Sequence, residues 1–177
     1  MTRAGYARLT WCATLTVAAT ALLSMPVKLV WNASASVPIG LYRISSSGPP
    51  KVGDLVLVRP SEPVAQFMAE RRYVGPRTPL LKHVVAIPEQ QVCRIGLRII
   101  IDGSYRGSAL TSDRSGRPLP VWRGCRRLQA GEIFLMNIGI PNSLDGRYFG
   151  PTSASAVIGS ATPLFTRGDK TTASKRQ

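Results

Sequence analysis

Residues 79–88, Pro-Leu-Leu-Lys-His-Val-Val-Ala-Ile-Pro, form the strongest strand candidate in this chain and indicate its fold class. The run is apolar, contains several β-branched residues and is bounded by proline at both ends, which is typical of a short buried strand. A single lysine, Lys82, interrupts it and is followed by His83, the one histidine of the chain. Because neighbouring side chains of a strand point to opposite faces, Lys82 and His83 are not expected to face the same site.

Short apolar runs separated by long loops continue on both sides of this segment. The expected strands are 41–44, 55–58, 92–95, 97–101, 133–136 and, as a final pair or one bent strand, 154–165. One helix is expected in this region, beginning at the N-cap candidate Ser61 and ending near Arg72. The 16 glycines and 14 prolines favour turns over a helical bundle. The sequence therefore predicts a compact, mostly β domain, barrel-like or sandwich-like.

An apolar segment precedes this domain. Arg3 and Arg8 lie before the apolar run 9–25, and residues 29–31 extend it to the length of a membrane-spanning helix. Basic residues on its N-terminal side predict that this end is cytoplasmic and that the body lies outside. The predicted organisation is a cytoplasmic N-terminus (1–8), a transmembrane anchor (9–31), a periplasmic β-rich domain (32–166) and a disordered basic tail (167–177).

A cleaved signal peptide is the alternative reading of the same segment. The small residues 33–35, Ala-Ser-Ala, fit a cleavage site, and cleavage after Ala35 would leave Ser36 as the new N-terminus. In both interpretations the β-rich domain that follows is exported.

Charge and cysteine content limit the classes of partner. The net charge is +14, but the basic residues are scattered, without a helix-long stripe or interleaved aromatic residues, so nucleic-acid binding is not expected. The excess of basic residues is instead expected to favour contact of the protein with an anionic membrane surface. With one histidine and no Cys-x-x-Cys pair, neither a metal site nor a cofactor is expected. Cys12 lies in the apolar segment, whereas Cys93 and Cys125 suggest one disulfide or two separate buried thiols.

A hydroxyl-rich turn follows the apolar segment at residues 34–40, Ser-Ala-Ser-Val-Pro-Ile-Gly. A serine becomes a nucleophile only when a base removes its proton. His83 is one candidate base and would need an acidic partner. The acidic candidates are Asp54, Asp102, Asp113 and Asp145.

Lys82 is the other candidate base. An ordinary lysine, with a pKa of about 10.4, is neutral in roughly one molecule in 2,500 at pH 7. Burial among apolar residues lowers that pKa, and Lys82 has the most apolar surroundings of any body lysine. The alternative role for Lys82 is that of a strand-edge lysine that prevents aggregation.

Three segments resemble conserved boxes of type I signal peptidases. They are residues 36–42 (Ser-Val-Pro-Ile-Gly-Leu-Tyr), residues 79–88 and residues 143–150 (Ser-Leu-Asp-Gly-Arg-Tyr-Phe-Gly). The first segment is most similar to the TraF-type peptidases that mature pilins for conjugative transfer. The first box begins at Ser34, because residues 34–38 (Ser-Ala-Ser-Val-Pro) resemble the Ser-x-Ser-Met-x-Pro region of the family. All three boxes occur in the family order after one N-terminal apolar segment, and together with Pro151 they span residues 34–151. The resemblance implies a signal-peptidase-like β domain.

The resemblance also implies roles for individual residues. Ser36 would be the nucleophile, and Lys82 the general base and then the general acid toward the leaving amine. The backbone N–H of Ser36 and the hydroxyl of Ser34 would form the oxyanion hole. Asp145, with Arg147, would support the site or act in it directly.

The chain departs from the family pattern at two of these positions. Gly146 replaces a serine that can hydrogen-bond the lysine, so that Ser143 or no hydroxyl would take its place, and Val37 replaces a methionine at a packing position. Cys93 and Cys125 match cysteines of the TraF-type subfamily, which favours the disulfide.

The implied function is that of a serine peptidase at the bacterial inner membrane, with its catalytic domain in the periplasm. It would mature a membrane-inserted pilin precursor, by cleavage or by cyclisation, next to membrane lipid and other proteins of the conjugation machinery. The alternatives are a general type I signal peptidase and a non-catalytic exported scaffold of a secretion apparatus.

Overall fold

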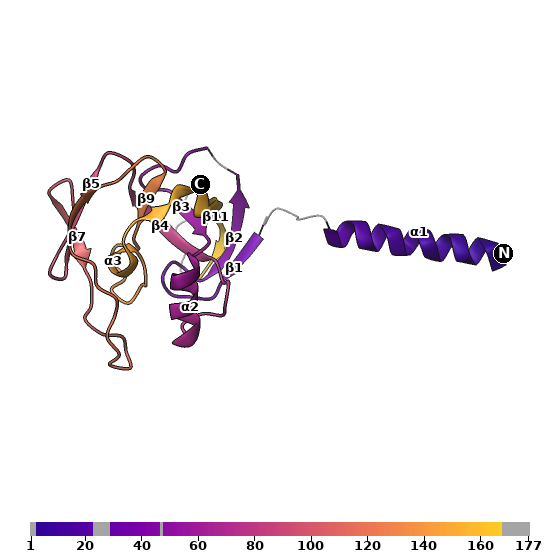
Figure 1. Ribbon diagram of the computed structural model, residues 1–177, viewed down its shortest axis with the longest axis horizontal. Coiled ribbons are helices and arrows are strands. Elements are labelled where there is room, and N and C mark those ends of the chain that lie inside the picture. The colour runs from indigo at the N-terminus through magenta and orange to yellow at the C-terminus, as the bar shows by residue number, and fades with distance from the viewer. Residues whose placement is uncertain (1–2, 23–28, 47, 168–177) are drawn as a thin grey trace, which may run out of the picture.

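The computed structural model describes residues 3–22, 29–46 and 48–167. Helix α1 (Arg3–Leu22) lies apart from a β-rich body, as Figure 1 shows. Within the described ranges, no helix combines the length and the apolar character needed to cross a membrane. Residues 23–28 of the predicted anchor and residues 168–177 of the predicted tail lie outside the described part of the chain.

The predicted extension of the apolar segment through residues 29–31 is wrong. These residues belong to strand β1 (Leu29–Asn32), which pairs antiparallel with β2 (Gly40–Ser45). Val30 lies opposite Tyr42 and packs against the core cluster that contains it. Backbone pairing and this apolar contact hold the segment as a strand, and neither can be read from hydropathy. At the other end, Arg167 donates its backbone N–H to the Ile39 carbonyl at 2.7 Å, so the strand layer reaches the first residue of the predicted tail.

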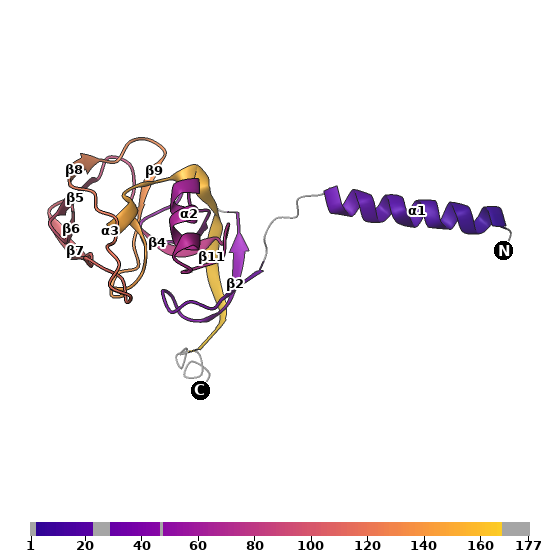
Figure 2. The same cartoon turned by 60° about the horizontal axis from the view of Figure 1, so that its bottom comes forward.

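Two antiparallel sheets make up the body, which confirms the mostly β prediction. The seven-stranded sheet contains, in order, β1, β2, β11 (Val157–Thr166), β3 (Leu55–Val58), β4 (Leu80–Ala86), β9 (Glu132–Leu135) and β10 (Thr152–Ser153). The four-stranded sheet contains, in order, β7 (Ser104–Ser108), β6 (Arg98–Ile101), β5 (Gln91–Ile95) and β8 (Gly124–Arg127). Figure 2 shows the smaller sheet at one side of the body.

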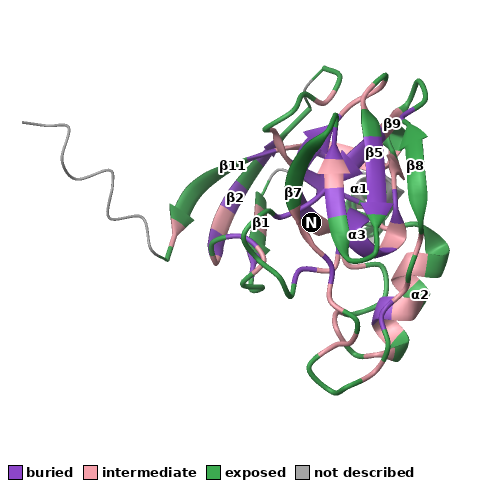
Figure 3. Ribbon diagram, turned by 90° about the vertical axis from the view of Figure 1, so that its left-hand side faces the viewer, coloured by how far each residue is buried: buried purple, intermediate pink, exposed green. Residues whose placement is uncertain are grey.

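Apart from β1, the apolar strands lie where they were expected, and the polar strands were missed. The expected strand 55–58 is β3, and the expected pair 92–95 and 97–101 is β5 with β6. Residues 154–165 form a short 3₁₀ helix (Ala154–Ala156) followed by one strand, β11, that pairs with both β2 and β3. β7 and β8 were not among the expected strands. They are largely exposed, as Figure 3 shows, so they carry no apolar pattern to mark them.

Two short helices cover the side of the body where the site lies. Helix α2 (Glu62–Glu70) begins after Ser61 with proline in its first turn and ends before Arg72. Helix α3 (Gly146–Phe149) begins after Asp145, whose side chain caps it by accepting the backbone N–H of Arg147. The rings of Phe67 in α2 and Phe149 in α3 meet edge to face, with centroids 5.7 Å apart.

The close approach of β2 and β11 requires glycine at position 40. A Cβ on Gly40 would lie 2.0 Å from the Phe165 carbonyl oxygen, and its φ of +156° is one that other residues rarely adopt. This glycine therefore brings the loop before β2 close to the C-terminal strand.

Candidate active site

Ser36 lies in the loop between β1 and β2, and Asn32 organises that loop. The Asn32 side-chain amide donates to the carbonyls of Ser34, Val37 and Pro38 at 2.8, 3.1 and 3.1 Å. Its Oδ1 accepts the backbone N–H and the hydroxyl of Ser34 at 3.1 and 3.0 Å. Asn32 is buried, so these bonds are shielded from water and fold the loop tightly around one amide.

Asn32 was missed by the sequence analysis, which placed the preceding residues in an anchor. An asparagine just before a turn rich in serine and proline is a signal for such a loop, since asparagine side chains hydrogen-bond nearby backbone groups. The Ser34 and Ser36 hydroxyls lie 3.0 Å apart within the loop. Because Ser34 donates its only hydroxyl proton to Asn32, Ser36 is the donor between the two serines.

Lys82 is a buried lysine in the middle of β4. It lies opposite Val56 of β3, and only 5% of its surface is exposed. Its Nζ donates to the Ser143 hydroxyl at 2.7 Å. Burial lowers the Lys82 pKa to about 8, while the nearby Asp145 carboxylate raises it and Arg147 lowers it. Desolvation outweighs the attraction to Asp145, so the neutral amine becomes accessible near physiological pH.

Ser36 and Lys82 line the same cavity, of about 590 Å³, although they are 46 positions apart in sequence. Ser34 and Ser143 line it as well. Among the described contacts, the Lys82 amine bonds to Ser143, and none joins it directly to Ser36. The cavity therefore brings together a hydroxyl cluster and an amine of lowered pKa, which are the components of a base-activated nucleophile.

His83 occupies the opposite face of β4, as expected from the alternation of a strand. It lines another cavity, of about 500 Å³, which Ser36 itself and the residues that follow it also line. Its Nδ1 lies 3.1 Å from the Asn137 Oδ1, so its partner is an amide. None of the four aspartates considered as its acidic partner contacts it within the described part of the chain. Asp54 accepts from the backbone of Lys51, Asp102 from Gln90 and Gln91, Asp113 from Tyr73 and Arg117, and Asp145 from Arg147 and Asn137.

Asp145 and Arg147 form a buried two-bond ion pair. Arg147 Nε and Nη2 donate to the two carboxylate oxygens, each at 2.9 Å, and the two side chains are 2% or less exposed. Arg147 also donates to the carbonyls of Ile140 and Ser143, at 2.7 and 3.1 Å. The pair therefore ties together both ends of the loop that carries Ser143.

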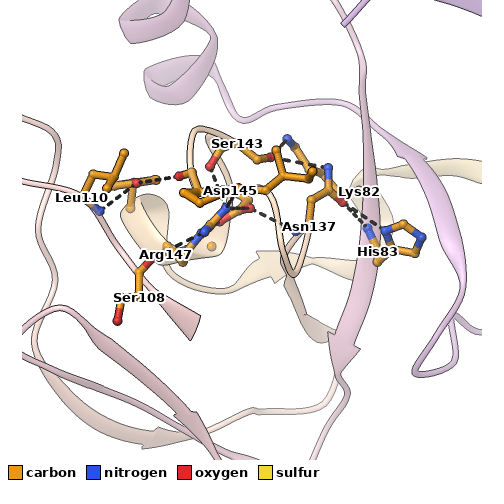
Figure 4. A network of polar contacts seen from close by, with 12 residues as sticks. Lys82, His83, Ser108, Leu110, Asn137, Ser143, Asp145 and Arg147 are labelled. Atoms are coloured by element: carbon orange, nitrogen blue, oxygen red, sulfur yellow. Dashed lines mark hydrogen bonds and ion pairs between the residues drawn. The ribbon is translucent and has the colours of Figure 1, made fainter. Parts of the chain in front are cut away.

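Asn137 links this ion pair to β4 and was not among the predicted site residues. Its backbone N–H donates to Asp145 at 3.1 Å, and its side-chain amide donates to the Leu81 carbonyl at 3.3 Å and to the Ser143 hydroxyl at 3.4 Å. Figure 4 shows the resulting chain of contacts from Arg147 and Asp145 through Asn137 and Ser143 to Lys82.

Gly146 has no room for the serine that the family pattern places there. A Cβ at this position would lie 2.7 Å from the Leu135 carbonyl oxygen and 2.9 Å from the Phe134 ring. The Gly146 carbonyl accepts the Trp122 indole N–H at 2.9 Å, and the Trp122 ring meets the Phe134 ring of β9 edge to face, so Trp122 links α3 to β9. Ser143 supplies the hydroxyl to the lysine instead.

The structure joins Cys93 of β5 to Cys125 of β8 in a disulfide, across paired positions of the smaller sheet. Cys12 is exposed on α1 and is a free thiol. Within the described ranges, no three His, Cys, Asp or Glu residues gather in a group that could hold a metal ion.

Three comparisons place the chain among known proteins. The family model described as signal peptidase, peptidase S26, matches residues 1–165. A conjugal transfer protein TraF from Agrobacterium fabrum is 37% identical over 147 residues, covering 76% of this chain and 81% of the relative. A probable conjugal transfer protein TraF from Sinorhizobium fredii is 32% identical over 180 residues, covering 93% and 92% of the two chains.

A plasmid transfer protein TraF from Escherichia coli is 29% identical over 144 residues, covering 76% of this chain and 81% of the relative. A signal peptidase I of known crystal structure, from Enterococcus faecalis, is 16% identical and aligns with 67% of this chain and 100% of its own at a TM-score of 0.40. The family model matches nearly the whole chain, and the two TraF relatives align with most of it. Both results agree with the three sequence segments and their order. This chain therefore belongs to the signal peptidase family, peptidase S26.

Proposed function

We propose that this chain is a membrane-anchored serine endopeptidase that matures an exported pilin precursor for conjugative plasmid transfer, with Ser36 as nucleophile and Lys82 as general base. One observation carries the proposal: the buried Lys82 amine, with its pKa lowered to about 8, lines the same cavity as Ser36. The names of the relatives, which are conjugal and plasmid transfer proteins, support the biological setting.

The chemistry is acyl transfer. At pH 7 a lysine with a pKa near 8 is neutral in roughly one molecule in ten, far more often than an exposed lysine. The neutral amine takes the Ser36 proton, and the Ser36 oxygen attacks a peptide carbonyl to give a tetrahedral oxyanion. Lys82 then returns the proton to the leaving amine as the peptide bond breaks, which leaves an acyl-enzyme.

The oxyanion would be stabilised by the Ser36 backbone N–H, with the Ser34 hydroxyl as a second donor. In the resting loop the Ser34 proton is engaged by Asn32 Oδ1, so it must turn away from Asn32 to reach an oxyanion. The Asn32 amide would keep the rest of the loop in place during this change, because its three bonds to backbone carbonyls do not involve either hydroxyl.

Either water or an amine resolves the acyl-enzyme. Attack by water returns Ser36 and releases a trimmed linear pilin. Attack by the amino terminus of the same substrate chain forms a new peptide bond and releases a cyclic pilin. The difference between the two products is one water molecule.

We also propose that the N-terminal segment anchors the enzyme in the inner membrane, with the body in the periplasm. The arginines before the apolar run 9–25 support this orientation. The disulfide supports export, because disulfides persist in oxidising compartments. Ser36 lies only 11 residues past the end of the apolar run 9–25, so the site would work close to the membrane surface on inserted precursors.

The test is to co-express the chain with the pilin precursor of the same transfer system and to measure the precursor mass. We expect processing by the wild type and none by Ser36→Ala or Lys82→Met. The matched controls are Ser104→Ala and Lys51→Met, which alter exposed side chains of the body. A product lighter by one water than the linear form would identify cyclisation.

Full processing by both site variants would refute the dyad and favour the non-catalytic scaffold. Cleavage of unrelated signal sequences at the same rate as the pilin precursor would favour a general signal peptidase. Membrane fractionation of the same cells tests the anchor, because a cleaved signal peptide would leave a soluble body.

A further inference from the structure

Beyond Ser36 and Lys82, the wall of their shared cavity is strongly positive. Four arginines line it, and Asp113 is the one carboxylate among its described lining residues. The four are Arg71, Arg72, Arg114 and Arg117. They come from the end of α2 and from the loop 109–119, two segments that are distant in sequence.

Asp113 is fully engaged and neutralises only part of this charge. One of its oxygens accepts the backbone N–H groups of Ser115 and Arg117 at 2.8 and 2.9 Å. The other accepts the Tyr73 hydroxyl and the Arg117 Nε, the latter at 2.8 Å, and lies 3.9 Å from Arg71. The hydrogen bond from Tyr73, followed by those from Arg117 and Ser115, holds the Asp113 pKa well below its usual range, so this carboxylate stays ionised.

Aromatic rings fix two of the arginines in the wall. The Arg71 guanidinium lies 4.3 Å from the centre of the Phe67 ring, and the Arg117 guanidinium lies 5.3 Å from the centre of the Tyr73 ring. Arg71 also donates to the Pro118 carbonyl at 2.8 Å, which joins α2 to the loop. These contacts hold the positive wall in a defined shape before any ligand arrives.

Arg72 and Arg114 are exposed and have no ion-pair partner among the described residues. Arg72 follows the end of α2 with a φ of +57°, where the chain reverses and glycine is the usual residue. An arginine at such a position strains the backbone. A helix C-terminus also attracts cations, which is a structural role for Arg72 that needs no ligand.

We propose that the positive wall formed by the four arginines binds a carboxylate of the substrate chain close to the scissile bond. The source is either an Asp or Glu side chain or the C-terminal carboxylate. The inference rests on the proposed function, since it places the substrate in the cavity of Ser36 and Lys82. The same cavity is also lined by three apolar residues, Val74, Leu110 and Leu119. The favoured occupant is therefore an apolar peptide segment that carries one or two acidic groups.

The experiment uses the full-length enzyme and the pilin precursor, with kcat and KM measured for cleavage. The enzyme variants are Arg72→Glu, Arg114→Glu and their combination, with Arg123→Glu, an exposed arginine outside this cavity, as the matched control. The precursor variants replace each Asp and Glu near the cut by Asn and Gln, and a separate precursor is amidated at its C-terminus.

We expect the double variant to raise KM about tenfold on the acidic precursor, since each exposed charge pair contributes up to a few-fold. The effect should disappear on the one precursor that lacks the recognised carboxylate, and a Glu→Lys precursor should be cleaved better by the double variant than by the wild type. Loss of the effect on the neutralised precursor identifies a side chain, whereas loss on the amidated precursor identifies the C-terminus.

The proposal would be overturned in favour of a helix-capping role if the double variant raised KM equally on acidic and neutral precursors. A lowered melting temperature that accounted for the loss of cleavage would have the same meaning. If the double variant no longer bound phosphatidylglycerol vesicles, while its KM depended on precursor charge as that of the wild type does, the arginines would form a lipid site and the proposal would be overturned. A precursor without a carboxylate near the cut, yet cleaved normally, would also overturn it. These outcomes leave the dyad intact, whereas failure of the wild type to cleave would refute the proposed function itself.

Discussion

The Lys82 Nζ donates a 2.7 Å hydrogen bond to the Ser143 Oγ, joining two residues that are 61 positions apart in sequence. Ser143 is itself held by the Asn137 amide and lies beside the buried Asp145–Arg147 pair. The amine is therefore oriented by a rigid polar network on one side and faces the cavity of Ser36 on the other.

Replacing Ser143 by alanine should reduce kcat by about 10- to 100-fold with little change in KM. The amine would lose the acceptor that aims it, and small misplacements of a catalytic group cost about that much. Cleavage kinetics of the precursor measure the effect, with Ser104→Ala, an exposed serine outside the cavity of Ser36, as control. Unchanged kcat would show that Ser143 does not orient the lysine.

The pH dependence of kcat/KM should rise with pH to a plateau, with its midpoint near pH 8. The base form of Lys82 is the neutral amine, and its pKa is lowered to about 8 by burial. The profile is measured between pH 5.5 and 10 on one precursor. A midpoint near 6.5 would instead indicate that the histidine is the base.

Lys82→Met should stabilise the protein at pH 7, by up to about 3 kcal/mol in the free energy of unfolding. In the wild type the folded-state pKa lies below the unfolded value, so the unfolded chain binds more protons between pH 8 and 10.5. The wild type therefore gains stability as the pH rises through this window, and its difference from the variant should shrink. Urea unfolding at pH 7 and pH 10.5 measures this, with Lys51→Met as control. A difference that does not depend on pH would contradict the buried, charged lysine.

Asp145→Asn should lower the free energy of unfolding by about 3–5 kcal/mol, because it leaves the buried Arg147 charge uncompensated. In the protein that still folds, the midpoint of the pH profile should move below pH 8. The reason is that the Asp145 carboxylate raises the Lys82 pKa and the amide does not. Lost activity with full stability and an unmoved midpoint would indicate direct chemistry by Asp145.

Gly146→Ser should destabilise the protein by about 1–3 kcal/mol, even though it restores the family's usual residue. Its Cβ would meet the Leu135 carbonyl oxygen at 2.7 Å and the Phe134 ring at 2.9 Å, and backbone cannot move aside easily. Thermal unfolding tests this against Gly48→Ser, where a Cβ meets nothing within 4 Å. Equal stability of the two variants would show that β9 can shift.

The sequence predicted the features that depend on local pattern. Apolar runs with proline and glycine boundaries indicated β2, β3, β4, β5, β6, β9 and β11, and three short segments in the right order indicated the family. It did not reveal β7 and β8, whose exposed polar residues have no period, or β1, whose hydropathy matches an anchor. Such segments become strands because they pair with other strands, and this pairing joins residues that a local sequence pattern cannot relate.

By itself, the sequence determined that Lys82 stands in an apolar strand beside His83 and that a hydroxyl cluster follows the N-terminal segment. Only the tertiary structure decided which hydroxyl meets the amine, because Ser143 reaches Lys82 through a loop that the Asp145–Arg147 pair holds closed. It also decided that Asn32 folds the Ser36 loop and that four arginines extend the same cavity. The physical reason is that burial and hydrogen-bond partners, which set the pKa and direction of a side chain, arise from segments that meet only after folding.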